Sequence, residues 1–590
     1  MGELRTNHFH GGLDIKTDQK TGLPVHAAAD GYISRISVQH KGYGNALYIT
    51  HPNGLITVYG HLEWFNGAID TFITNFLYQE QCNETDLLVE KGKLVVRKGQ
   101  IVAFSGNTGS SGGPHLHWEI RDNEERLLNP LFFDFPEIVD KQLPVVNKIA
   151  LRTFGIDSRI EGEFGRVEYI PVREINNFVL RFPIHAWGTI GLELRTYDKM
   201  DGTSNLYGIS IIEMTVDKKK VFTHDIQRIG FDENPYINAH IDYEMAQRYR
   251  TFFQRCYVSD GNELKTYAVE KESGKIFIND TLVHDVSVKI TDAYRNFTTL
   301  NFKIKGTRNQ LTKPVSSFSK PKGKTKRVIN YLRHAEFENI LKVECLGNKE
   351  NGAALYFKSK KVDVEPVYAK SNEQVYLWDL RSALPDSIIA GKQKHIFNFK
   401  EVVPSRNAVN YSSPNIDIIF PKKAVFDTLF LDLSFSDRIF TIQRPTIPLF
   451  APVSIVLKPD FEIKNKAKAA VYNLDAKRRG KFSGGIWTNN TIKFGTKIFG
   501  DFTIKEDTIS PKITYFRTLG NTLYFKMSDN LSGVQHWYGY LNGEFVVMQY
   551  EAKYNVIFTK CKDNAKPLKG DFVLGAVDNM GNMTEIKFTF

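Results

Sequence analysis

The chain reads GPHLHWEI from Gly113 to Ile120. Because successive side chains of a β-strand point to opposite faces, a strand here would turn His115, His117 and Glu119 to one side and the apolar residues between them to the other. The two imidazoles would stand about 7 Å apart along the strand. The apolar side predicts a buried core. The histidine side has two interpretations, a metal or catalytic role and simple exposure to water.

A second segment with histidine and carboxylate lies upstream and reads NHFHGGLDI from Asn7 to Ile15. The spacing of His10 and Asp14 would also suit one face of a helix, but the paired glycines between them weaken a helix interior. In an extended segment both side chains lie on one side, and a glycine between them lets another group approach closely. Two imidazoles, one carboxylate and an open fourth position form the ligand set of a catalytic zinc site. These two residues and one histidine of the HLH triplet could supply it.

Two more segments lie between these histidines, Tyr59-Gly60-His61-Leu62 and Gly106-x-Thr108-Gly109. Together the four segments resemble the lysostaphin/LytM-type zinc metalloendopeptidases, in the same order and with similar spacing over residues 5–130. The resemblance implies a small antiparallel β-fold. It also implies hydrolysis of peptide bonds in the peptidoglycan of bacterial cell walls.

Carried over position by position, the resemblance implies that His10, Asp14 and His117 bind one zinc ion per chain. It also implies that His61 and His115 are the catalytic histidines. Zinc lowers the pKa of its bound water and polarises the scissile carbonyl. His115 is then expected to act as the general base or to orient the water, and His61 to stabilise the transition state, although the two roles could exchange.

Other polar residues of this region have less specific interpretations. His61 shares parity with Thr57 and Tyr59 on its predicted strand, so it can face the same groove as the metal. Glu119 shares parity with the HLH pair, but the family does not use this position for chemistry, and a supporting role is expected. His8 precedes the first predicted ligand by two residues and is an alternative ligand. Three further histidines are interpreted as structural or solvated: His26, His40 and His51.

The composition is that of a large globular protein suited to anionic surroundings. Its 590 residues are too many for a single core and predict about three to five domains. Aromatic residues make up 13% of the chain, which favours β-rich domains over helical ones. The net charge of +11 favours polyanions such as wall polymers, lipopolysaccharide or nucleic acid. No nucleic-acid-binding motif is present, so the expected partners are peptidoglycan cross-links and other envelope components.

Cysteine usage and apolar runs give little information on the compartment. The four cysteines form no CxxC pair, so neither a disulfide framework nor a cysteine zinc site is predicted. They are Cys82, Cys256, Cys345 and Cys561. No apolar run reaches about 18 residues, so no transmembrane segment is predicted, and no signal peptide is predicted from the residues given. Family members usually carry more chain here, so we expect a trimmed export signal and a location in the cell envelope or periplasm, or outside the cell.

The predicted fold class is all-β and mainly antiparallel. A small β-sheet metallopeptidase domain over residues 1–140 carries a short helical insertion at about 63–90, where apolar residues recur at helical spacing. The insertion is either a wall that shapes substrate access or a decorated loop. Three units are expected to follow: an Ig-like β-sandwich at 141–306, a β-rich domain at 307–455 after a basic linker, and an Ig-like β-sandwich with lead-in strands at 456–590.

An internal repeat supports the two Ig-like units. Residues 198–209 and 529–534 read DKMDGTSNLYGI and DNLSGV, each after an alternating strand. Both units close on an Asp-x-x-x-Asn-x-Thr pattern before a last strand, at 292–298 and 578–584. Asp and Asn in such turns usually hydrogen-bond their own backbone, but the acidic turns could also hold calcium. Between the copies, residues 303–327 form a Lys- and Arg-rich linker, either a solvated connector or a binder of anionic wall polymer.

The function predicted from these features is zinc-dependent cleavage of peptidoglycan cross-links, with the β-sandwich modules positioning the catalytic domain. One alternative is a non-catalytic scaffold with a degenerate peptidase domain that binds peptidoglycan or a partner, and another is a surface adhesin. All five key positions are present, which favours the enzyme. A diaminopimelate-type D,D cross-link is expected rather than a glycine bridge, because the insertion at 63–90 departs from the compact glycine-cutting members.

Overall fold

The computed structural model describes residues 3–5, 7–133, 135–270, 272–308, 331–346, 352–358, 360–370, 373–562 and 568–590. Nearly all regular structure in these residues is β-strand, and most strand pairs are antiparallel, which confirms the predicted all-β class. No helix in this part of the chain combines the length and the apolar character needed to cross a bilayer. The predicted basic linker lies outside the described residues from 309 onward.

The first unit is a β-sheet in which the HLH strand pairs with β3 and β7. Its main strand order is β12-β11-β7-β6-β5-β8, while β3 pairs with β11, and β10 pairs with β4 and β7. The Asn53-Gly54 turn joins β6 to β7, as predicted. Its elements are β1 Leu4–Arg5, β2 His8–Phe9, β3 Leu13–Lys16, β4 Pro24–His26, β5 Gly31–Val38, β6 Asn45–Thr50, β7 Ile56–Phe65, α1 Gly67–Gln79, β8 Thr85–Leu88, β9 Val95–Val96, β10 Ile101–Ser105, β11 His115–Arg121 and β12 Leu127–Leu128.

The second unit surrounds one large apolar core with strands in the order β14-β13-β17-β25-β24-β18-β19-β22. Two of its strand pairs, β16 with β25 and β17 with β25, are parallel. Its elements are β13 Val145–Ile160, β14 Arg166–Tyr169, β15 Val172–Glu174, β16 Asn177–Val179, β17 Ile184–Tyr197, β18 Ile211–Val216, β19 Lys219–Asp225, β20 Arg228–Ile229, α2 Ile237–His240, α3 Tyr243–Tyr249, β21 Gln254–Arg255, β22 Tyr267–Val269, β23 Ile276–Ile278, β24 Val283–Thr291 and β25 Phe297–Gly306.

The strands between 331 and 506 form two groups of sheets. The first group contains β26 Tyr331–Phe337, β27 Ile340–Leu346, β28 Ala353–Phe357, β29 Lys360–Val364, β30 Tyr368–Lys370, β31 Glu373–Asp379, β32 Ser387–Ala390 and β33 Gln393–Ile396. The second contains β34 Phe399–Val403, β35 Val409–Ser412, β36 Ile416–Phe420, β37 Leu429–Ser436, β38 Ile439–Ile442, β39 Val453–Leu457, β40 Ala469–Leu474, β41 Gly480–Gly484, β42 Ile486–Thr488, β43 Thr491–Thr496 and β44 Gly500–Glu506.

A domain boundary between residues 455 and 456 would cut a strand. Both residues lie inside β39, which pairs with β36 on one side and β43 on the other. The strand pairing instead breaks between β33 and β34, and again after β44. We therefore replace the predicted division of 307–590 with a proposed one of three units, at 331–396, 399–506 and 512–589.

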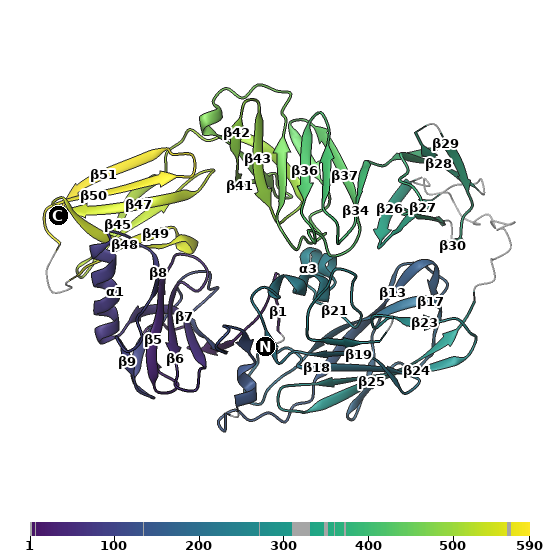
Figure 1. Ribbon diagram of the computed structural model, residues 1–590, viewed down its shortest axis with the longest axis horizontal. Coiled ribbons are helices and arrows are strands. Elements are labelled where there is room, and N and C mark those ends of the chain that lie inside the picture. The colour runs from purple at the N-terminus through teal and green to yellow at the C-terminus, as the bar shows by residue number, and fades with distance from the viewer. Residues whose placement is uncertain are drawn as a thin grey trace, which may run out of the picture.

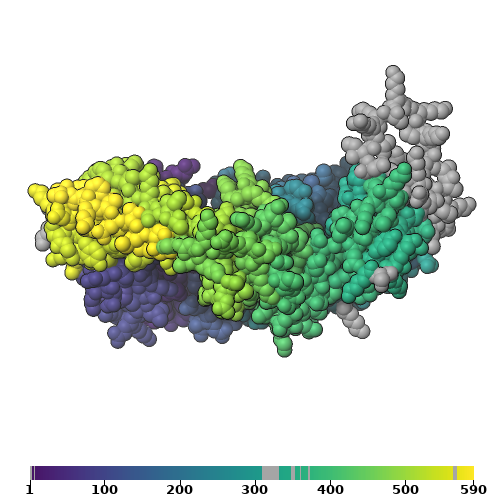
Figure 2. Space-filling model, turned by 90° about the horizontal axis from the view of Figure 1, so that it is seen from above, coloured from purple at the N-terminus to yellow at the C-terminus, as the bar shows by residue number. Residues whose placement is uncertain are grey.

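The last unit lies against the first. Its strands are β45 Lys512–Leu519, β46 Thr522–Ser528, β47 Val534–Leu541, β48 Glu544–Glu551, β49 Val556–Lys560, β50 Asp571–Asp578 and β51 Met583–Thr589. In Figure 1 the units follow one another around a ring, so that the yellow C-terminal unit contacts the purple N-terminal one beside α1. Figure 2 shows the same two units packed together when seen from above.

The helical insertion serves as the docking surface for that last unit. Lys560 Nζ lies 2.8 Å from Asp70 Oδ1 on α1, and the Tyr78 hydroxyl donates to the Lys560 carbonyl at 2.8 Å. The Asn83 side chain donates to the Trp537 carbonyl and accepts from a backbone N–H of β48, both at 2.7 Å. The predicted helix is therefore present. One of its faces packs in the core of the first unit, its other contacts are with the C-terminal unit, and none of its residues lines the cavity beside the histidines.

Candidate functional site

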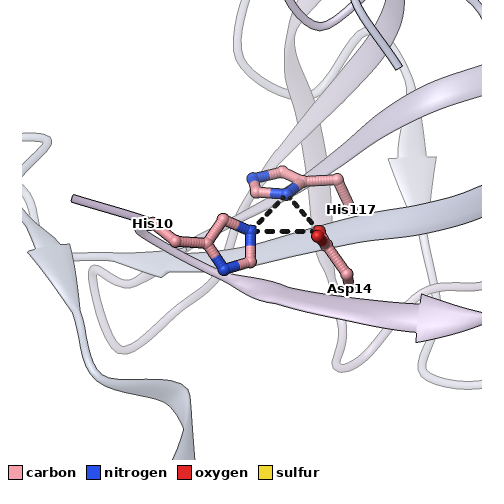
Figure 3. Close-up of side chains that lie close together, drawn as sticks. All are labelled: His10, Asp14 and His117. Carbon is pink, nitrogen blue, oxygen red and sulfur yellow. Dashed lines mark hydrogen bonds and ion pairs between the residues drawn. The ribbon is translucent and has the colours of Figure 1, made fainter. Parts of the chain in front are cut away.

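Three donor atoms converge at one edge of the first unit's sheet (Figure 3). His10 Nε2 lies 3.0 Å from Asp14 Oδ1 and 3.3 Å from His117 Nδ1, and the third side of the triangle, from His117 Nδ1 to Asp14 Oδ1, is 2.9 Å. Ligand atoms bound about 2.0–2.1 Å from a tetrahedral zinc ion lie about 3.3 Å apart, so the spacing suits that metal. These are the three residues that the sequence predicts as ligands.

Antiparallel pairing of β3 with β11 brings two of the three side chains together. The register sets Asp14 directly opposite His117. Gly12 lies so close to β11 that a Cβ atom there would come within 2.3 Å of the Trp118 carbonyl oxygen. The glycine between the first two predicted ligands thus permits the close approach expected from the sequence.

The other nitrogen of each ligand histidine faces a carboxylate. His10 Nδ1 lies 3.1 Å from Glu3 Oε2, and His117 Nε2 lies 2.8 Å from Glu119 Oε1. A carboxylate accepts the N–H of a neutral imidazole, so each ring presents its remaining nitrogen to the triangle as a lone pair. Two lone pairs and the Asp14 carboxylate facing one another need a positive charge between them, either a metal ion or the proton that His117 takes up without metal. The donor set therefore fits a divalent metal on electronic as well as geometric grounds.

Glu119 belongs to a buried polar array behind His117. Its Oε2 accepts from Arg121 at 2.6 Å, and its Oε1 accepts from the Tyr43 hydroxyl at 2.6 Å. Burial would raise the pKa of Glu119, but the hydrogen bond with His117 and the Arg121 charge outweigh it and lower that pKa to about 2. Burial would lower the pKa of His117, yet its hydrogen bonds to Asp14 and Glu119 raise that pKa to about 9 in the metal-free protein.

Glu3 and Arg5 take part in the site, although sequence reasoning did not single them out. The Arg5 guanidinium donates to Asp14 Oδ2 at 2.7 Å and pairs with Glu3 at 3.0 Å. Burial would raise the pKa of Asp14, but its close contacts with His10, His117 and His115 hold that pKa far below its ordinary value. Glu3 and Arg5 lie in a short segment before the motifs, where no residue spacing indicates a role. Arg121 lies on the same strand face as Glu119, so strand alternation could have identified it.

The two remaining motif histidines, His61 and His115, lie beside the triangle. Their ring centroids are 4.8 Å apart, and His115 Nε2 lies 3.5 Å from Asp14 Oδ1. His115 Nδ1 donates to the Gly113 carbonyl at 2.8 Å, and His61 Nδ1 donates to the Thr108 carbonyl at 2.9 Å. Each neutral ring therefore carries its lone pair on Nε2. Burial and the charges of the two neighbouring histidines lower the pKa of His61 to about 4, which favours its neutral form.

His61 faces the site for a different reason from the strand alternation on which its prediction rested. Tyr59 and Leu62 both pack in the apolar core, and Thr57 is buried with its hydroxyl bonded to the Tyr59 hydroxyl. Strict alternation would therefore have turned His61 into the core. Its φ of +59° interrupts the alternation and brings the ring to the face of Gly60. Gly60 is opposite His117, and a Cβ atom there would contact that ring.

Two of the predicted ligands, His10 and Asp14, line a large cavity. Its volume is about 820 Å³, and it lies between the first unit and the loop at 198–208 of the second. His10, Asp14 and His115 line its near side. The exposed β2 histidine, His8, is outside the triangle of donor atoms. The other three histidines of this unit bond elsewhere, namely His26 to Gly99, His40 to Glu84 and His51 to Asp30 and Thr57.

We expect Glu119→Gln to lower the zinc affinity of the full-length protein about 10- to 100-fold. The carboxylate orients the His117 ring and makes its metal-facing nitrogen more basic, which a neutral amide does less well. Competition with a calibrated chelator measures the affinity. Glu125→Gln is the matched control, because Glu125 also faces Arg121, at 3.5 Å, but is 54% exposed. An unchanged affinity in a folded Glu119→Gln protein would show that this carboxylate does not support the ligand.

Comparisons with known proteins match two parts of the chain. Residues 8–75 and 72–130 match Peptidase family M23, and residues 400–507 match a Zu5-like domain. The DD-carboxypeptidase/endopeptidase Mpg of Neisseria meningitidis serogroup B is 38% identical over 133 residues, which are 22% of this chain and 24% of that protein. The peptidoglycan DD-endopeptidase ShyB of Vibrio cholerae is 33% identical over 111 residues, 19% of this chain and 20% of that protein. The chain thus aligns with less than a quarter of the length of each relative.

Similar solved structures also overlap with a limited part of the chain. The catalytic domain of lysostaphin from Staphylococcus simulans is 28% identical and covers 20% of this chain and 68% of that one, with a TM-score of 0.14. A zinc-containing peptidase from Vibrio cholerae is 32% identical and covers 19% of this chain and 27% of that one, also with a TM-score of 0.14.

Proposed function

We propose, from the premise that residues 8–130 form a peptidase family M23 domain, that this chain is a zinc-dependent endopeptidase acting on peptide cross-links of bacterial peptidoglycan. The observation that carries the proposal is the triangle of two imidazole nitrogens and one carboxylate oxygen at His10, Asp14 and His117. A zinc ion bound there would supply a water molecule that is acidic near neutral pH and would polarise the scissile carbonyl.

The other catalytic and positioning roles belong to side chains of the protein. His115 is assigned as the general base, since its Nε2 is free of backbone contacts and lies beside the ligand triangle. His61 is assigned as the group that stabilises charge on the substrate carbonyl oxygen, and the two roles are exchangeable because both rings have the same Nδ1 anchoring. Glu3, Arg5 and Glu119 are positioning residues, which hold the ligands in orientation.

The proposed substrate is a D,D cross-link between peptide stems. Support comes from the relatives, whose names include DD-endopeptidase and DD-carboxypeptidase/endopeptidase. The insertion at 63–90, which departs from the compact glycine-cutting members, contacts the C-terminal unit through α1. Peptidoglycan lies outside the cytoplasm, so we propose that the protein works in the cell envelope or beyond it.

The units after residue 140 are proposed to position the catalytic domain without taking part in the chemistry. Lys553 Nζ of the last unit lies 3.4 Å from the Gly109 carbonyl oxygen and 3.3 Å from that of Ser111, and the Tyr554 hydroxyl accepts from Asn107 at 3.0 Å. All three contacts are with the glycine-rich loop that leads into the HLH strand. Ser111 Oγ in turn lies 3.2 Å from His115 Nδ1. The C-terminal unit therefore supports the loop that orients a proposed catalytic histidine.

Digestion of purified, cross-linked sacculi tests the proposed function. We expect the full-length protein to release uncross-linked peptide stems that end in free D-Ala, identified by mass spectrometry. Heat-inactivated protein is the control for spontaneous release. Intact cross-links together with tight pelleting of the protein with the sacculi would contradict the enzyme and favour the non-catalytic scaffold.

A further inference from the structure

Two groups of buried and half-buried aspartates occur at junctions between units. In each group, one carboxylate oxygen from each of three residues lies within 4.8 Å of the others. The first group is at the junction of the first and second units, and the second is where the 399–506 strands meet the last unit. Their members are Asp140, Asp198 and Asp292 in the first, and Asp507, Asp529 and Asp578 in the second.

The two groups are built alike, which extends the repeat seen in the sequence. In the first, Asn296 Nδ2 donates to Asp292 Oδ2 at 2.9 Å and to the Asp140 carbonyl at 3.1 Å. In the second, Asn582 Nδ2 donates to Asp578 Oδ2 at 2.7 Å and to the Asp507 carbonyl at 2.9 Å. The same asparagine thus joins the closing turn of each unit to the segment that enters it.

The first group contains carboxylate oxygens without partners. Asp198 is only 2% exposed, and neither its Oδ1 nor Asp140 Oδ2 has a hydrogen-bond partner among the described residues. Burial and the charges of Asp292 and Asp140 raise the pKa of Asp198 to about 8. Burial likewise raises the pKa of Asp292 to about 6. Ionised carboxylates are costly to bury beside one another, and a bound cation would remove the cost.

A buried tyrosine hydroxyl provides a separate observation at the second group. The Tyr472 side chain is fully buried, and its hydroxyl has no hydrogen-bond partner in the described part of the chain. The hydroxyl lies near the acidic group: burial, together with the charges of Asp507, Asp529 and Asp578, raises the pKa of Tyr472. Asp529 Oδ1 is also buried without a partner. A cation bound at the acidic group would offer these buried oxygens a partner.

We propose that each group binds one calcium ion. The donors at both sites are oxygens, carboxylate above all, and calcium accepts six to eight of them at about 2.3–2.6 Å in flexible geometry. Zinc prefers nitrogen and sulfur ligands, which neither group offers. No ion pair between described residues involves any of the six aspartates, so no lysine or arginine already provides the positive charge.

Such ions would fix two junctions of the ring. Asp140 belongs to the segment that connects the first two units, and Asp507 to the segment that enters the last one. The first site also borders the large cavity beside His10 and Asp14. Asp198 and the loop at 198–208 form the far wall of this cavity, and Glu137 to Val139 lie beside them. Calcium there would hold that wall in place opposite His10 and Asp14.

Calcium titration of the full-length protein tests this inference. Protein stripped of metal and given back one equivalent of zinc is titrated with calcium chloride by calorimetry, and its thermal unfolding is followed with and without calcium. We expect two calcium ions per chain and a higher unfolding temperature. Asp198→Asn should remove one ion and Asp529→Asn the other, while zinc content stays at one. Asp363→Asn, at a side chain 75% exposed, is the control and should keep both.

Several results would overturn the inference. The wild-type titration decides the case without any variant, since absence of binding at millimolar calcium excludes both sites. Retention of two calcium ions by a folded double variant, Asp198→Asn with Asp529→Asn, would show that the ions bind elsewhere. An equal response to magnesium would exclude calcium as the specific ion.

Discussion

The His117→Ala variant is expected to lose at least about nine-tenths of the zinc that the wild-type protein carries, and with it all measurable peptidase activity. A site left with one imidazole and one carboxylate cannot hold zinc tightly at neutral pH. The loss should be severe because His117 is buried, is opposite Asp14 in the β-sheet, and is oriented from behind by Glu119. Metal content after purification, measured by inductively coupled plasma mass spectrometry, gives the result.

A neighbouring histidine provides the matched control for that variant. His8 lies two residues before the first ligand but is exposed and outside the donor triangle, so His8→Ala should keep one zinc ion per chain. A full equivalent of zinc in His117→Ala would contradict the ligand assignment. His115 would then be the next candidate, since its Nε2 lies 3.5 Å from Asp14 Oδ1.

The His61→Ala and His115→Ala variants should separate catalysis from metal binding. Each is expected to keep one zinc ion and to lose about a hundredfold or more in kcat, because proton transfer or charge stabilisation is lost while the ligands remain. Neither histidine is part of the triangle, and both are anchored through Nδ1 to backbone carbonyls. Hydrolysis of a cross-linked muropeptide dimer, followed by chromatography, measures the rate.

His26→Ala is the control for these two variants, since that histidine is exposed and bonds to the Gly99 carbonyl. It should retain wild-type rate and zinc content. Loss of zinc from His61→Ala or His115→Ala would make the affected residue a ligand. An undiminished rate in either variant would remove it from the catalytic assignment.

Local patterns in the sequence were sufficient to predict the frame of the first unit. Period-two alternation located the HLH strand, the Asn53-Gly54 dipeptide located a hairpin, and helical spacing located α1. The paired glycines before Asp14 correctly indicated a close approach between strands. These features depend on neighbouring residues only, which is why they can be read without a structure.

Other features depend on contacts between distant residues and could not be predicted. Parity placed His61 correctly for the wrong reason, because a single left-handed residue reverses the alternation on which the argument rested. The role of α1 became clear only from its contacts with residues far along the chain, such as Lys560. The boundary expected at 455 fell inside β39 because a run of strands gives no local sign of which sheets they join. Arg5 likewise carries no spacing signal.

The measurement that tests the central claim most directly is a zinc titration of metal-stripped, full-length protein during hydrolysis of a purified D,D-cross-linked muropeptide dimer. The stripped protein should be inactive, and the rate should rise in proportion to added zinc and level off at one equivalent per chain. The products should be the two monomers of a cut cross-link. Unchanged activity in stripped protein, or no cleavage at one equivalent of bound zinc, would contradict the account.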